Sequence, residues 1–281
     1  MRGLGRSAAA ISIVNALPMG IGCAHGVRLY AAATIDLEPA ASPHVEVEPA
    51  SSRTPIVVAS VEAALHHLQP GTSFSAVLQL ASEIPVAKGL KSSSAVATAA
   101  IRSVANALQA DLDSIPVARL AAQVGRKVGV SATGAFDDAL AGLVPGFVVT
   151  DNRSEELLLR QAADPGWTAV VHVPGGTHPA SPTVQERFRS AAPEAERAIQ
   201  AARRGAWAAA MQENTLLVER VMGYDYGDLR DRLRREGAVA SGVSGLGPAL
   251  VSLVPRARAS AVVSALPPER FVVPLTSEDH P

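Results

Sequence analysis

The chain has 281 residues, of which 48% are apolar and 18% charged, with a formal net charge of −1. This apolar fraction excludes intrinsic disorder, and the length suits one large domain or two of ordinary size. Basic residues number 25 and acidic residues 26, so charge gives no case for a nucleic acid or an anionic membrane as partner. The single cysteine, Cys23, excludes a disulfide framework and a cysteine-based zinc site.

Residues 1–25 hold two arginines before a mostly apolar run, a pattern that resembles a secretion signal. However, Asn15, Pro18 and Gly20 interrupt the run, which is also too short to span a membrane. We therefore expect a first β-strand over residues 9–16, followed by a glycine-containing loop, in a cytoplasmic protein.

Hydrophobic periodicity predicts the elements that follow. They are strands at 26–38 and 45–47, a helix at 55–68, a strand at 73–80, a helix from about 95 to 108, and a helix at 114–128 capped by Ser114.

A change of domain is expected at 145–153, which divides the chain into 1–150 and 151–281. The predicted elements beyond it are a strand at 167–173, a helical region at 193–222 broken near Gly205, a helix at 224–236, a strand at 249–254, a helix at 257–266 and a strand at 271–275. Because strands and helices mix here without a regular βαβ rhythm, we expect an α+β fold rather than a doubly wound sheet.

The segment Lys88–Ser94 lies between a predicted strand and a predicted helix start. Free N–H groups and the dipole at a helix N-terminus favour an anion. Gly89 allows close approach of the backbone, and the segment adds two lysines and three serines: Lys88, Lys91, Ser92, Ser93 and Ser94. A plain helix cap needs one serine, so the segment predicts a phosphate site. No P-loop, nucleophile elbow or H-E-x-x-H sequence occurs.

Two adjacent carboxylates, Asp137 and Asp138, follow Gly134. Neighbouring side chains on a regular backbone point in different directions, so we expect at most one of them to face a given site. The other would act as a helix cap or dipole partner. These residues alone leave open whether either is a base.

The segment 241–249 contains three glycines: Gly242, Gly245 and Gly247. Such a backbone can pack closely against a ligand or another loop, although a long hairpin turn is the alternative.

These segments, in this order, resemble the GHMP kinase superfamily, whose central motif reads P-x-x-x-G-[LI]-G-S-S-A-A. Lys91 replaces the usual glycine and Ser94 the first alanine. The matching residues are Pro85, Gly89, Leu90, Ser92, Ser93 and Ala95. This variant, with residues 133–139 and 13–16, is similar to the archaeal-type shikimate kinases over about residues 3–275.

The resemblance implies a two-domain α+β fold. An ATP-binding domain of the ribosomal protein S5 domain 2 type (1–150) would pack on a ferredoxin-like domain (151–281), with the site between them. The expected cofactor-binding residues are Pro85, Lys88, Gly89, Leu90, Lys91, Ser92, Ser93, Ser94, Ala95, Gly242, Gly245 and Gly247. Ser93 would also help to hold Mg²⁺, and Asp137 would orient or deprotonate the acceptor hydroxyl.

The implied activity is ATP-dependent phosphorylation of the shikimate 3-hydroxyl, a step towards chorismate and the aromatic amino acids. An arginine is the expected partner of the substrate carboxylate. Several enzymes of the superfamily carry a first-loop lysine near where Ile21 stands, so Lys88 or Arg28 would have to supply that charge here. The alternatives are another GHMP kinase such as homoserine kinase, and a non-catalytic protein that binds a small ligand on this fold.

Overall fold

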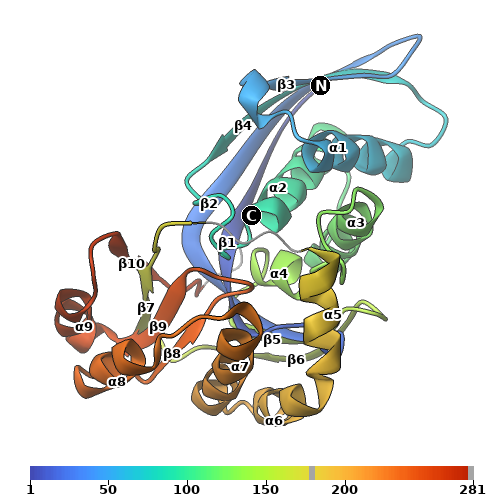
Figure 1. Cartoon of the computed structure of the whole chain (residues 1–281). Coiled ribbons are helices and arrows are strands. Elements are labelled where there is room, and N and C mark those ends of the chain that lie inside the picture. The colour runs from blue at the N-terminus through green and yellow to red at the C-terminus, as the bar shows by residue number, and fades with distance from the viewer. Residues whose placement is uncertain (177–180, 278–281) are drawn as a thin grey trace.

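Two β-sheets organise the chain, and the computed structural model describes residues 1–176 and 181–277 of it (Figure 1). The first sheet has the order β3-β4-β2-β5-β6, with β1 paired to β2, and the second has the order β10-β7-β9-β8. The strands are β1 (Arg2–Val14), β2 (Ile21–Pro39), β3 (His44–Glu48), β4 (Phe74–Ser82), β5 (Phe147–Asp151), β6 (Glu156–Gln161), β7 (Trp167–His172), β8 (Ala240–Val243), β9 (Leu250–Pro255) and β10 (Arg270–Pro274).

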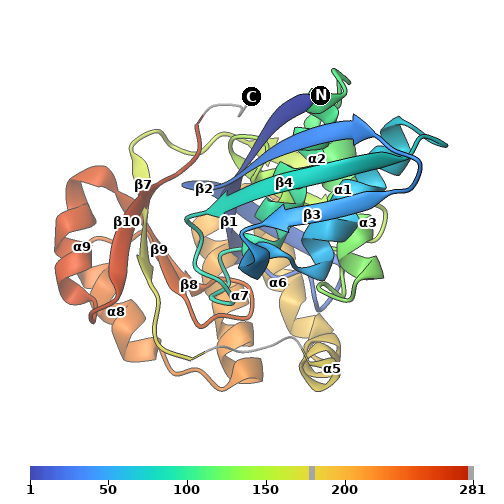
Figure 2. The ribbon, with the colours of Figure 1, turned by 90° about the horizontal axis from the view of Figure 1, so that it is seen from above.

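Helices cover the first sheet on one side, where α1, α2 and α3 lie together (Figure 2). The helices are α1 (Pro55–Leu68), α2 (Ser92–Ala107), α3 (Ser114–Lys127), α4 (Phe136–Ala141), α5 (Pro182–Ser190), α6 (Ala192–Arg203), α7 (Trp207–Met222), α8 (Gly227–Arg235) and α9 (Ala259–Ala265), with 3₁₀ turns at Ala50–Ser52 and Arg256–Arg258. The mixture of sheets and helices confirms the α+β class.

The first strand begins earlier than expected, at Arg2 instead of residue 9. The alanine-rich helix α2 packs directly on the backbone of β1 and explains the difference. A Cβ atom at Gly3 would overlap with the carbonyl oxygen of Ser103, and one at Gly5 would overlap with that of Ala99. These glycines permit close packing of a helix on a strand.

The expected change of domain at 145–153 contains a strand of the first sheet. β5 pairs antiparallel with β2 through Ile21–His25, and β6 continues the sheet to Gln161. The division at residue 150 remains a prediction, since the second sheet begins only at Trp167.

The second sheet has the connectivity of a ferredoxin-like fold. In chain order β7 is followed by helices, then β8, β9, α9 and β10, while in space β10 and β9 flank β7. All neighbouring strands are antiparallel. This is the split β-α-β-β-α-β arrangement, so the fold expected for the C-terminal half is confirmed.

One helix prediction is wrong: Asp113 rather than Ser114 occupies the N-cap position of α3, and its side chain makes no capping hydrogen bond. The break expected near Gly205 in the region 193–222 is confirmed, because α6 and α7 are separate helices and Gly205 adopts a left-handed conformation (φ +71°) between them. α5 was not predicted, although Ser181 followed by a proline is a helix-start signal, and the Ser181 hydroxyl accepts from the Val184 N–H at 3.2 Å.

Within the described parts of the chain, none of the helices combines the length and the apolar composition needed to cross a membrane.

A buried histidine on β2 makes the stability of the fold depend on pH. His25 contacts the edge of Phe147, whose ring stacks on Trp207 with centroids 4.4 Å apart. Its Nδ1 lies 2.7 Å from the Gly26 carbonyl oxygen, and burial lowers its pKa from 6.5 to about 4. The unfolded chain therefore binds a proton at a higher pH than the folded protein does.

We predict that the free energy of unfolding falls as the pH drops from 6.5 to 4, by about 3 kcal/mol from His25 alone. Replacing His25 with Asn should remove this part of the pH dependence, because an amide does not titrate. Urea unfolding at several pH values measures the effect, with exposed His66→Asn as control. Equal slopes for His25→Asn and the wild type would contradict the prediction.

Candidate active site

A cavity of about 260 Å³ brings the predicted segments together. Its described lining comes from the end of β1 and the first loop (residues 15–20), the phosphate loop (residues 87–94), helices α1 and α3, the segment 130–138 that leads into α4, and the loop after β8. The lining includes Ser12, Asn15, Gly89, Lys91, Ser92, Ser93, Ser94, residues 131–135, Asp137, Asp138, Gly245 and Gly247. A larger cavity of about 370 Å³, at Arg160, Trp167 and Arg256, contains none of the predicted site residues.

The phosphate loop enters α2 through two residues in the left-handed conformation, Gly89 (φ +87°) and Lys91 (φ +63°). Lys91 is the N-cap residue and makes no side-chain hydrogen bond to the first turn of α2. Ser92, Ser93 and Ser94 line the cavity at that turn. Backbone amides and hydroxyls therefore surround the positive end of the helix dipole, which is an arrangement that binds phosphate.

One hydroxyl fixes the phosphate loop to both sheets. Ser244 follows β8 and is fully buried. Its Oγ donates to the Gly89 carbonyl at 2.7 Å and accepts from the Ser12 N–H at 3.0 Å. A Cβ atom at Gly89 would overlap with the Ser244 carbonyl oxygen, so the two loops meet backbone to backbone.

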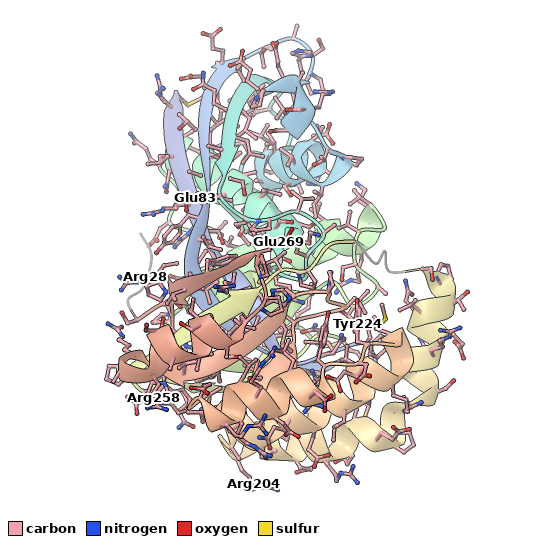
Figure 3. The ribbon with its side chains drawn as sticks, turned by 60° about the vertical axis from the view of Figure 1, so that its left-hand side comes forward. Arg28, Glu83, Arg204, Tyr224, Arg258 and Glu269 are labelled. Carbon is pink, nitrogen blue, oxygen red and sulfur yellow. The ribbon has the colours of Figure 1, made fainter. Side chains whose placement is uncertain are left out.

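The glycines of the segment 241–249 have different positions. A Cβ atom at Gly245 would lie 2.8 Å from Lys91 Nζ, and its carbonyl accepts from Asn15 Nδ2 at 3.1 Å. Gly247 (φ +76°) lies against the hydroxyl of Tyr224, whose position is labelled in Figure 3. This hydroxyl donates to the carbonyl oxygen of Leu246 at 2.7 Å.

Gly242 is not at the cavity. It belongs to β8, and a Cβ atom there would overlap with the hydroxyl of Thr215 on α7. Its role is to let the strand pack closely on that helix, so only two of the three predicted glycines reach the site.

Both adjacent aspartates line the cavity, contrary to the expectation that at most one would. They lie in the first turn of the short helix α4, which begins after Ala135 in a left-handed conformation (φ +54°). Successive residues do point in different directions, but the cavity wraps around this helix end and meets both.

Asp138 forms a mostly buried ion pair, with Oδ2 at 3.1 Å from Lys91 Nζ. Burial and the charge of Asp137 raise the pKa of Asp138 to about 7, against the opposing effect of Lys91. Lys91 thus connects the phosphate loop to the acidic pair.

Asp137 is held by groups without charge. The Asn152 amide donates to its Oδ1 at 2.8 Å, and the Asp137 N–H donates to Asn152 Oδ1 at 3.2 Å. On the other side, a Cβ atom at Gly22 would overlap with Asp137 Oδ2, so the absence of a side chain there makes room for the carboxylate. The sequence gives no signal that would pair Asn152 with Asp137.

The cations expected to replace the first-loop lysine lie elsewhere. Lys88 Nζ donates to the carbonyls of Pro174 and Gly176 at 3.2 and 2.7 Å. Arg28 donates to Ser277 Oγ and lies on the opposite side of Figure 3 from Tyr224. Among the described residues that line the cavity, Lys91 is the one cationic side chain, and none is an arginine.

The remaining residues of the central motif do not line the cavity. Leu90 is fully buried in the core and Ala95 nearly so, while the Leu90 carbonyl accepts from the Ala10 N–H at 3.4 Å. Pro85 is not part of the cavity lining.

Over residues 1–176 and 181–277, no cluster of three or more His, Cys, Asp or Glu side chains could hold a metal ion by itself. The described donors suited to a cation bound with a nucleotide are the serine hydroxyls of the phosphate loop and the acidic pair.

Family models match both halves of the chain. The GHMP kinases N terminal domain matches residues 56–146, and the GHMP kinases C terminal domain matches residues 190–273. With relatives more than 30% identical over most of its length, the chain belongs to the GHMP kinases.

Its relatives within this family include curated shikimate kinases. The shikimate kinase of Pyrococcus abyssi is 32% identical over 255 residues, which cover 90% of this chain and 92% of that protein. The one from Pyrococcus furiosus is 35% identical, with coverage of 90% and 92%, and the one from Methanothrix thermoacetophila is 34% identical, with coverage of 94% and 90%.

Solved structures share the fold at lower identity. The mevalonate kinase of L. major, solved with R-mevalonate, has a TM-score of 0.72 at 15% identity, with 99% of this chain and 96% of that chain covered. A homoserine kinase from Cytophaga hutchinsonii has a TM-score of 0.69 at 15% identity, with the same coverage. The two-domain GHMP kinase fold is therefore confirmed.

We predict that Gly89→Ala will damage nucleotide use far more than Gly71→Ala. Both glycines have a positive φ, +87° and +83°, so alanine strains the backbone at each. Open space surrounds Gly71, whereas Gly89 lies against Ser244. Because a loop displaced by about 1 Å costs about 10²-fold, kcat/KM for ATP should fall by that amount in Gly89→Ala only. Equal effects in the two variants would show that loop contact is unimportant.

Proposed function

We propose that this protein is a shikimate kinase, which transfers the γ-phosphoryl group of ATP to the 3-hydroxyl of shikimate. The observation that carries the proposal is the 32–35% identity to shikimate kinases over at least 90% of the chain. A cavity that combines a phosphate loop with carboxylates supports it, because phosphoryl transfer depends on groups that hold the phosphates and on a residue that positions the attacking hydroxyl. The product leads towards chorismate and the aromatic amino acids, and the cytoplasm is the proposed location.

The phosphate loop has the chemistry to bind the nucleotide phosphates. The free amides of the first turn of α2 and the hydroxyls of Ser92, Ser93 and Ser94 are donors, and Gly89, Gly245 and Gly247 leave the backbone accessible. Mg²⁺ suits the same place, with Ser93 as one oxygen ligand and phosphate oxygens as others. When bound, Mg²⁺ would offset charge on the transferring group.

Asp137 is the proposed base. The acceptor hydroxyl would lie beside its carboxylate, which orients the hydroxyl and takes its proton late in an in-line transfer. Asp137 is only 3% exposed, and its carboxylate accepts a hydrogen bond from Asn152. The carboxylate is therefore held in one orientation by the protein rather than by water. Such positioning accounts for much of the catalysis in phosphoryl transfer.

Lys91 is the proposed source of positive charge. It occupies the position of a glycine in the usual motif, and its ammonium lies between the phosphate loop and Asp138. Asp138 holds this ammonium at the cavity, where it can offset charge on the phosphates. The structure thus offers Lys91 in the role expected of Lys88 or Arg28.

Homoserine kinase is the nearest alternative activity, and a protein that binds without catalysis is the alternative of another class. The likeness to a homoserine kinase structure is at 15% identity, which supports the fold rather than the acceptor. Since no arginine lies among the described lining residues, the groups that could bind a carboxylate are Lys91, the hydroxyl and amide side chains of the lining, and backbone amides.

We predict that ADP forms from Mg·ATP when shikimate is present, and not with homoserine, mevalonate or no acceptor. A coupled assay for ADP with each acceptor measures this directly. Turnover with homoserine alone would support the rival kinase, and tight ligand binding without ADP formation would support the non-catalytic alternative.

We further predict that Asp137→Asn lowers turnover by about 10²–10⁴-fold, the range of a lost general base. Asp138→Asn should lose much less turnover and instead unfold at a lower temperature, because it leaves the buried Lys91 ammonium without its partner. Both variants need confirmation of folding by circular dichroism. If Asp138→Asn is inactive while Asp137→Asn turns over normally, the roles of the two aspartates are reversed.

A further inference from the structure

We propose that Asn152 is a positioning residue for the phosphoryl transfer. Its amide holds the Asp137 carboxylate in a fixed orientation by a neutral hydrogen bond. This inference rests on the proposed function, since it assigns Asn152 to the base of that reaction.

The contacts of Asn152 leave its amide one orientation. The side-chain oxygen accepts from the Asp137 N–H at 3.2 Å and from Thr150 Oγ1 at 2.7 Å. The side-chain nitrogen must therefore face Asp137, and it donates to Oδ1 at 2.8 Å. A flipped amide would set an oxygen against the carboxylate and leave two donors unpaired.

A backbone hydrogen bond also fixes the position of Asn152. Its N–H donates to the Gly20 carbonyl at 2.8 Å, directly after β5 pairs with the start of β2. The residue is 1% exposed, so water does not compete for these bonds. Asn152, which directly follows β5, thus connects the first loop at Gly20 with α4 at Asp137, the proposed base.

The Asp137 carboxylate also lies against strand β2. Gly22 is the residue of β2 that faces the Asp137 carboxylate, and any side chain there would overlap with it. The nearby ammonium of Lys91 lies at 3.1 Å from the neighbouring Asp138. The Asp137 carboxylate accepts its side-chain hydrogen bond from the amide of Asn152.

A double-mutant cycle between Asn152→Leu and Asp137→Asn tests the proposal. Leucine has a similar shape but cannot form the hydrogen bonds, so a carboxylate that turns away should lower kcat by about 10²-fold. The KM values for ATP and shikimate should change less than about twofold, because binding groups are untouched. In the Asp137→Asn background, Asn152→Leu should cause no further loss, since it acts through Asp137.

Asn106→Leu is the matched control. Asn106 lies on α2 away from the cavity and donates to the Leu4 carbonyl, so the same chemical change should leave kcat as in the wild type. If Asn152→Leu does not fold, Asn152→Asp retains the acceptor for Thr150 and loses the donor. Asn152→Asp should lower kcat by about as much as Asn152→Leu. When it is combined with Asp137→Asn, it should lower kcat no further than Asp137→Asn alone.

Three results would overturn the proposal. They are a kcat within about threefold of the wild type, equal losses in both backgrounds, and a change confined to KM. If the wild type ignores shikimate but phosphorylates another acceptor, the proposed function fails, and the same cycle run with that acceptor still decides the role of Asn152. A wild type that phosphorylates none of the acceptors would overturn both.

Discussion

The contact between Gly89 and Ser244 is the constraint on which the site depends. Gly89 lies in the loop between β4 of the first sheet and α2, and Ser244 follows β8 of the second sheet. Their backbones meet because Gly89 has no side chain to separate them. The Ser244 hydroxyl then bonds to the Gly89 carbonyl and the Ser12 amide, so strand β1, the phosphate loop and the loop after β8 share one fixed point. Lys91 and Gly245 become neighbours as a consequence, and the cavity forms between them.

Much of the architecture followed from periodicity and spacing. The helix predicted at 55–68 has those bounds in the structure, because its apolar residues recur at helical spacing and a proline sits at its start. A loop that leads into a helix start was expected at residues 88–94, because glycine, serines and lysines gather there, and the structure has α2 begin at Ser92. These are local features, and local chemistry is what a sequence displays directly.

The features that could not be predicted depend on contacts between distant segments. The start of β1 at Arg2 was missed, because Gly3 and Gly5 fit a strand only where α2 packs closely on it. Lys88 and Lys91 are equivalent in the sequence of one loop, but the left-handed backbone at Lys91 sends the two ammonium groups to different places. The pairing of Asn152 with Asp137 joins the end of β5 to α4, and neither residue carries a mark of it.

The two adjacent aspartates illustrate how a buried site can keep two carboxylates with different properties. Like charges on neighbouring residues repel, and burial makes that repulsion stronger. The structure separates their partners: Asp138 has the ammonium of Lys91, and Asp137 has the neutral amide of Asn152. A single lysine shared by both would bind them into one network, and the loss of either would disturb the other. With separate partners, Lys91 pairs with Asp138 while the Asn152 amide fixes the orientation of the Asp137 carboxylate. The glycine at position 22 completes this arrangement, because it gives the Asp137 carboxylate space without bringing a second charge.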